Sequence, residues 1–282
     1  MQPRPRTRLD LVPRRVRVHA VQELSGSLRR ITFRDVDGAD PAAPTSLAAL
    51  RAPGPEDHVK VFLPDPATGE LHAPWVAPDG GLQRPADGVS VSRDYTVRAT
   101  RTSGGVAEVD VDWVLHGDEG PASAWAARAQ AGDEVVLAGP RGSVGLPDGL
   151  SRLTLAVDET GLPAAARWVA AVGPGVPVTA IVEIGDDVDE AFVEAELGHA
   201  SVEILYRTDG PGQIEEAVRS LGGLEDGEHL VALGEAGALV PVRRYLRREL
   251  GTPAEQLTVS GYWRRGVVNL DHHLPLDPSD PD

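Results

Sequence analysis

The chain has 282 residues, of which 41% are hydrophobic and 25% charged, a composition typical of globular proteins and a length sufficient for two domains. The absence of cysteine excludes disulfides, thiolate nucleophiles, Cys-ligated zinc and iron–sulfur clusters, so any electron transfer requires an organic cofactor. The formal net charge of -16 argues against nucleic acid and membrane partners, and the basic N-terminus lacks the apolar segment of a secretory signal, so we expect a cytoplasmic protein.

The first half of the chain contains short β-branched runs separated by Pro- and Gly-rich stretches. Their alternation of apolar and polar residues is typical of strands with one buried face. The runs cover residues 16–21, 28–33, 58–63, 95–98, 106–115 and 134–138, with one helix predicted at 122–129 and loops at 37–57 and 64–88. We therefore expect a small antiparallel β-barrel in this half.

After residue 150 apolar strands alternate with helices. The predicted strands are 153–157, 178–184, 202–206, 229–233 and 256–260, and the predicted helices between them are 163–172, 188–197, 214–221 and 236–250. Near-continuous apolar strands separated by helices indicate a parallel sheet covered on both faces, which binds ligands at the carboxyl ends of its strands. The expected fold class is β + α/β, with an antiparallel β-barrel domain at residues 1–147 and a parallel-sheet nucleotide-binding domain at 148–282.

Residues 91–98 place a guanidinium, an aromatic ring and a hydroxyl along one predicted strand. Because side chains alternate between the faces of a strand, Arg93, Tyr95 and Val97 share one face, and Asp94 and Thr96 share the other. Taken alone, this segment also fits an ordinary surface strand.

Residues 116–126 mark the point where a strand ends and a helix begins. His116 closes the strand, and the Gly120-Pro121 step opens the helix, since proline is well suited to the first helical turn. The free amides of such a turn bind phosphate groups. The alternative is a capped helix without a ligand, for which Ser123 is a suitable residue.

Together with four further tracts, these motifs resemble those of siderophore-interacting proteins, the FAD-binding ferric-siderophore reductases of the ferredoxin-reductase-like superfamily. The matching tracts are residues 93–96, 116–125, 138–143, 158–164, 234–237 and 260–266. They occur in order along nearly the whole chain.

The resemblance implies that the barrel domain binds FAD. Arg93 would pair with its pyrophosphate, Tyr95 would pack on the flavin or ribityl chain, and Thr96 would lie near the flavin N5 edge. Arginine binds phosphate in a bidentate manner and tyrosine offers a stacking face, which agrees with these roles. The full set of implied FAD-binding residues is Arg93, Asp94, Tyr95, Thr96, His116, Gly120, Pro121, Ala122 and Ser123. For His116, a role at the strand end without a bond to FAD is the alternative.

In the second domain the resemblance implies a site for NAD(P)H. Residues 158–163 occupy the first strand-to-helix turn but lack the glycine-rich dinucleotide fingerprint. By resemblance, Asp158 and Thr160 replace that loop, and Gly234 and Glu235 face the nicotinamide. An acidic turn with a helix cap is the alternative for residues 158–163, and a simple strand-to-helix turn is the alternative for residues 234–237.

Two charged residues predict opposite preferences for the dinucleotide. Arg207 follows a predicted strand and is placed to bind a phosphate, whereas Glu183 ends the preceding strand and is placed to bind a ribose hydroxyl. The sequence thus leaves NADH, NADPH or a ferredoxin as the electron donor.

The segment Tyr262, Trp263, Arg264 and Arg265 is expected nearest the substrate, because the resemblance places it beside the flavin and its arginines attract an anionic ferric chelate. Core packing is the alternative for the two aromatic residues. Relatives commonly continue into a polar or acidic helix, whereas this chain ends in a tail rich in Asp and Pro, which leaves the siderophore undefined. Adjacent histidines rarely ligate one ion, so we expect no metal site at His272 and His273.

The resemblance predicts a monomeric NAD(P)H-dependent ferric-siderophore reductase that holds FAD, with no obligatory catalytic side chain because the flavin carries the chemistry. The alternatives are a flavin reductase for another acceptor, such as a quinone or ferric citrate, and a protein that binds a siderophore and FAD without turnover.

Overall fold

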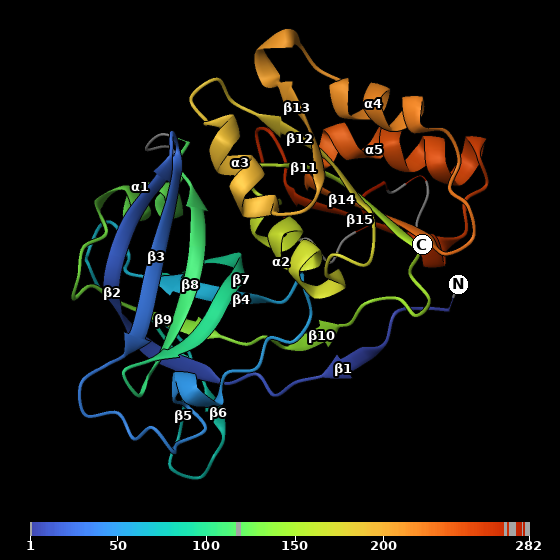
Figure 1. Cartoon of the computed structure of the whole chain (residues 1–282). Helices are drawn as coiled ribbons and strands as arrows, with labels where there is room; N and C mark the ends of the chain where they lie inside the picture. The colour runs from blue at the N-terminus through green and yellow to red at the C-terminus, as the bar shows by residue number, and fades with distance from the viewer. Residues whose placement is uncertain (1, 117–119, 268–269, 271–274, 278, 280–282) are drawn as a thin grey trace. The chain divides into compact units, whose positions relative to one another are not determined.

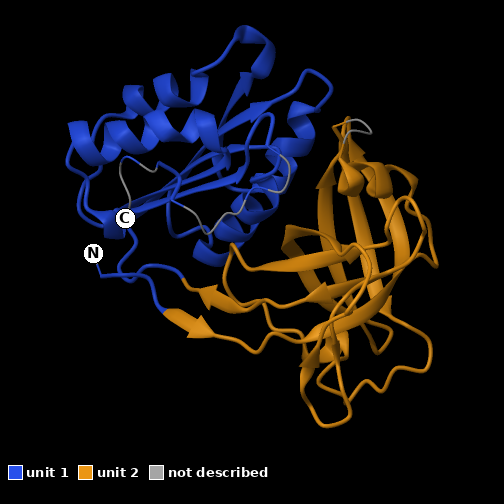
Figure 2. Ribbon diagram, turned by 180° about the vertical axis from the view of Figure 1, so that it is seen from behind, with its two compact units in different colours: residues 1–5, 146–282 blue, residues 6–145 orange. Residues whose placement is uncertain are grey.

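The computed structural model describes residues 2–116, 120–267, 270, 275–277 and 279. The described chain forms two compact units, residues 6–145 and residues 1–5 with 146–282 (Figure 2). The sequence predicted a domain boundary between residues 147 and 148, and that boundary stays a prediction.

The first unit is a closed antiparallel barrel in the strand order β2-β3-β8-β7-β4-β9 (Figure 1), as predicted. Its strands are β2 (Pro13–Ser25), β3 (Leu28–Asp35), β4 (His58–Leu63), β7 (Val91–Ser103), β8 (Val106–Val114) and β9 (Glu134–Ala138). Alternation directs one side of each strand inward, and in β4 the inward residues Val59, Val61 and Leu63 are buried. Helix α1 (Pro121–Arg128) packs its Ala122 and Ala126 into the same core.

Short strands outside the barrel were missed by the sequence pattern. Strand β1 (Arg6–Arg8) pairs with β10 (Gly142–Val144), and β5 (Trp75–Val76) pairs with β6 (Leu82–Gln83). The second pair lies inside the stretch predicted to be a loop. These strands have two or three residues each, which is too short for a recognisable alternation.

The second unit is a parallel sheet in the order β13-β12-β11-β14-β15, and helices cover both of its faces (Figure 1), as predicted. The strands are β11 (Arg152–Asp158), β12 (Val178–Ile184), β13 (Ser201–Tyr206), β14 (Glu228–Glu235) and β15 (Leu257–Trp263). The helices are α2 (Leu162–Val172), α3 (Glu190–Leu197), α4 (Gln213–Leu221) and α5 (Ala236–Arg244). Chain order changes direction across β11 and β14, the point at which such sheets bind nucleotides.

The predicted helix at 236–250 is wrong in its last turn. Helix α5 ends at Arg244, and Tyr245–Glu249 continues it as a π-helical turn. Pro241 lies inside α5 and removes one backbone donor, which weakens the regular helical pattern. In the part of the chain that the structure describes, no helix has the length and apolar character needed to cross a membrane.

Candidate functional site

The barrel site is organised around strand β7, which carries the predicted Arg-x-Tyr-Thr tract. Its register on β4 sets Arg93 opposite Val61 and Tyr95 opposite Val59. Because these partners are buried core residues, Arg93 and Tyr95 belong to the inward-facing side, and Asp94 and Thr96 to the other, as the alternation predicted.

Tyr95 is held by an aromatic row that joins two strands to helix α1. The ring centroids of Tyr95 and Trp113 are 3.9 Å apart, and those of Trp113 and Trp125 are 5.3 Å apart. Burial raises the pKa of Tyr95, only partly offset by the nearby Arg93 charge, so the phenol stays neutral. One face of the Tyr95 ring is therefore covered by Trp113. Contact between the rest of this ring and a flavin stays a prediction.

The charged residues of this tract have defined neighbours. Arg93 Nη1 donates to the Ser92 carbonyl at 2.7 Å, and the Asp94 carboxylate accepts a 2.8 Å hydrogen bond from Lys60 Nζ on β4. Asp94 thus ties β7 to β4 across the sheet, a structural role that the sequence did not indicate. The pyrophosphate role of Arg93 stays a prediction.

Helix α1 begins without a side-chain cap from the described residues. Gly120 is its N-cap in extended geometry, and Pro121 follows in the first turn. Ser123 lies inside the first turn, after the N-cap, and its hydroxyl accepts a 3.0 Å hydrogen bond from the His116 amide. The His116 ring lies against Gly120, where an added Cβ would be 3.1 Å from Cε1. The first turn of α1 and an arginine on the neighbouring strand β7 are a donor set that fits the diphosphate of FAD.

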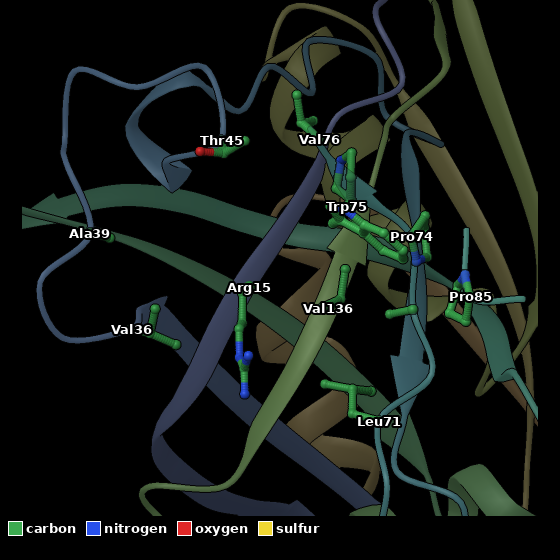
Figure 3. A pocket seen from close by; sticks show the side chains of 12 residues that line it. Arg15, Val36, Ala39, Thr45, Leu71, Pro74, Trp75, Val76, Pro85 and Val136 are labelled. Atoms are coloured by element: carbon green, nitrogen blue, oxygen red, sulfur yellow. The ribbon is translucent and has the colours of Figure 1, made fainter. Parts of the chain in front are cut away.

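A cavity of about 480 Å³ lies elsewhere on the barrel, lined in part by β2, β9 and β5 (Figure 3). Figure 3 shows Arg15, Trp75, Pro74 and Val136 around it. None of the predicted cofactor-binding residues lines this cavity.

In the second unit, Asp158 is the centre of a hydrogen-bond cluster at the carboxyl edge of the sheet. Its carboxylate is buried and accepts bonds from the Thr160 amide at 2.8 Å and hydroxyl at 2.5 Å. It also accepts from the Glu235 amide at 2.9 Å and from Trp263 Nε1 at 2.8 Å. Burial raises the pKa of Asp158 to about 6, against the opposing effect of the bonds from Thr160 and Trp263.

Gly234 allows this cluster to form. Its φ is +151°, and an added Cβ would lie 2.6 Å from Asp158 Cγ, so only glycine fits this close approach. The next residue, Glu235, caps α5 by accepting from the Ala238 amide at 2.6 Å, and it also accepts from the Arg265 amide at 3.1 Å. Three predicted tracts, residues 158–160, 234–235 and 263–265, therefore meet at one edge.

Arg207 is paired with carboxylates, one of which is Glu183, the residue predicted to favour the opposite dinucleotide. Its guanidinium contacts the carboxylates of Glu159 and Glu183, the second at 3.3 Å from Nε. Glu159 is buried and accepts a further 2.6 Å hydrogen bond from the Gly185 amide. Glu159 was missed as a site residue, although it lies inside the acidic tract that the sequence singled out.

The predicted substrate segment lies at the end of β15. Trp263 is tied to Asp158, and Arg264 Nη2 approaches the Leu276 carbonyl at 3.4 Å. Tyr262 is partly buried and Arg265 is exposed. The role of these four residues in binding substrate stays a prediction. His272 and His273 lie outside the described residues, within which no group of three or more potential metal ligands occurs.

The same arrangement of an antiparallel barrel followed by a parallel sheet occurs in the ferredoxin-NADP⁺ reductase of Plasmodium falciparum, a likeness of fold at 11% identity and a TM-score of 0.58. Comparison with known proteins is more specific. Residues 17–144 match the family model described as a siderophore-interacting FAD-binding domain, and residues 150–266 match that described as siderophore-interacting protein. The chain belongs to the siderophore-interacting protein family.

Three relatives illustrate this membership. A siderophore utilization protein from T. fusca is 36% identical, with a TM-score of 0.79 over 96% of this chain and 100% of that one. The NADPH-dependent ferric-chelate reductase of Escherichia coli strain K12 is 32% identical over 71% of this chain and 74% of its own. The ferric vibriobactin reductase ViuB of Vibrio cholerae serotype O1 is 29% identical over 79% and 85%.

Proposed function

We propose that this protein is an oxidoreductase that reduces ferric siderophores with electrons from NAD(P)H through FAD, and so releases Fe(II) in the cytoplasm. The observation that carries the proposal is the pairing of the Arg93–Thr96 tract with the uncapped start of α1 on the barrel. Both features belong to the region that matches a siderophore-interacting FAD-binding domain.

Each unit contributes binding and orientation. On the barrel, Arg93 and the first amides of α1 would hold the FAD diphosphate, and Tyr95, fixed by Trp113, would position the ring system. On the second unit, the edge formed by Asp158, Glu235 and their neighbours would receive the dinucleotide. A bound FAD would supply the redox chemistry, taking up a hydride from the dinucleotide and passing single electrons to ferric iron.

Reduction explains how iron is released. Hard oxygen donors bind Fe(II) more weakly than Fe(III), because the electrostatic attraction falls with the charge of the ion. The predicted contribution of Arg264 and Arg265 is to attract an anionic ferric chelate to a protein whose net charge is -16. The E. coli relative is named as a ferric-chelate reductase that depends on NADPH, which supports this reaction class.

The substitution Arg93→Ala tests the FAD assignment. Loss of a charged hydrogen bond of about 1.5–3 kcal/mol predicts FAD binding weakened by roughly 10- to 100-fold. Arg128→Ala is the matched control, because Arg128 is an exposed arginine in the last turn of α1, at the opposite end of the helix from the proposed diphosphate site. Flavin content after gel filtration, read from visible absorbance, distinguishes the two variants. Full flavin retention by Arg93→Ala would show that the diphosphate is held elsewhere.

A further inference from the structure

The carboxyl ends of β12 and β13 carry an unusual concentration of negative charge. Residues 183–190 and 207–210, which the structure describes in full, contain a single cation, Arg207. The carboxylates in these two segments are Glu183, Asp186, Asp187, Asp189, Glu190 and Asp209. A ligand group placed here would therefore meet a negative potential.

The one cation of these two described segments, Arg207, is held by carboxylates. The Arg207 side chain is 35% exposed, whereas its partners Glu159 and Glu183 are 5% and 15% exposed. If Arg207 turned toward a phosphate, the buried Glu159 would lose its charged partner, which is strongly unfavourable in a desolvated position. Among the described residues, the Gly185 amide would then remain as a hydrogen-bond donor to that carboxylate.

Two of the acidic side chains accept hydrogen bonds from residues at and after the end of β13. Tyr206 donates its hydroxyl to Glu190, and Thr208 donates to Asp186 at 2.9 Å. These two hydrogen bonds give Glu190 and Asp186 defined positions beside the end of β13.

In dinucleotide-binding sheets that carry the glycine-rich fingerprint, an acidic residue about 20 residues further along the chain binds the ribose 2′-hydroxyl of NAD. This chain lacks the fingerprint but has an acidic residue at the end of the strand next to the first one. Glu183 occupies that position, since β12 pairs directly with β11. We propose that residues Glu159, Glu183 and Arg207 select a dinucleotide with a free ribose 2′-hydroxyl, NADH, and disfavour the 2′-phosphate of NADPH. This inference rests on the proposed function, because it specifies the electron donor of that reaction.

Isothermal titration of the flavin-loaded protein with NAD⁺ and NADP⁺ measures this preference without turnover. We expect NAD⁺ to bind at least 10-fold more tightly. Glu183→Gln removes one negative charge and one partner of Arg207. It should therefore lower the ratio of the NADP⁺ dissociation constant to the NAD⁺ dissociation constant by roughly 10-fold. Glu203→Gln, an exposed residue on β13, makes the same charge change away from Arg207 and should leave the ratio unchanged.

Equal or tighter binding of NADP⁺ by the wild-type protein would overturn the inference, as would an unchanged ratio in Glu183→Gln. Flavin reduction by each reduced dinucleotide separates this failure from failure of the proposed function. Preferential reduction by NADPH refutes only the selection of NADH. Reduction by neither dinucleotide refutes NAD(P)H as the donor and the inference with it.

Discussion

Replacing Gly234 by alanine is expected to lower the unfolding free energy by more than backbone strain alone would, because it also disrupts the Asp158 cluster. A non-glycine residue at a φ of +151° is strained by about 1–3 kcal/mol. The new Cβ would also lie 2.6 Å from Asp158 Oδ2, the atom that accepts from Glu235 and Trp263. Displacement of that oxygen weakens both bonds, so the total loss of unfolding free energy is about 4 kcal/mol.

Gly222→Ala is the matched control for this experiment. Gly222 ends α4 at a φ of +77°, and no described atom lies within 4 Å of its Cβ position. Its substitution should cost only the backbone strain, about 2 kcal/mol. Urea denaturation followed by circular dichroism gives both values. Combining Gly234→Ala with Asp158→Ala should recover part of the loss, because the overlapping carboxylate is removed. The reasoning would be refuted if Gly234→Ala and Gly222→Ala lost the same unfolding free energy and if the losses from Gly234→Ala and Asp158→Ala simply added in the double variant.

Two further predictions concern the second unit. Because the folded pKa of Asp158 is raised to about 6, its protonated form stabilises the fold, and about 3 kcal/mol is lost as pH rises from about 4 to 6. His229, whose pKa burial lowers to about 4, contributes the opposite slope, with stability lost as pH falls from about 6.5 to 4. In Asp158→Asn the unfolding free energy should therefore fall more steeply than in the wild-type protein as pH is lowered from about 6 to 4. An unchanged pH profile would contradict the raised pKa of Asp158. Arg4→Ala removes a 2.9 Å hydrogen bond to Thr258 and a guanidinium 4.5 Å from the Trp168 ring centroid, so it should lower the urea midpoint by an amount equivalent to about 1–2 kcal/mol.

Most of the fold could be predicted because its strands have clear patterns. The predicted strands at 58–63, 134–138 and 178–184 coincide with β4, β9 and β12. Each is a short apolar or alternating run, bounded by residues that favour turns. The strands β1 and β10 could not be found in this way, because they are three residues long and largely polar, and only their pairing with one another defines them.

The site residues could be singled out by motif, but their contacts depend on the order of the strands. The Trp263 indole reaches Asp158 across 105 positions of sequence, because β14 alone separates their strands in the sheet. The pairing of Arg207 with Glu159 likewise spans β11 to β13 with β12 between them. A sequence pattern indicates the chemistry of each residue separately, whereas the order of the strands in the sheet determines which charged side chains lie close enough to pair.

The anaerobic visible spectrum of the purified protein tests the central claim most directly. NADH or NADPH is added first, and a ferric hydroxamate or catecholate siderophore follows in the presence of a ferrous-specific chelator. The proposed function predicts flavin absorbance that bleaches with the dinucleotide and returns with the siderophore, while the ferrous complex accumulates. A bound flavin that never bleaches would contradict reduction by NAD(P)H and favour another electron donor or a carrier, and a protein without flavin would contradict the central claim itself.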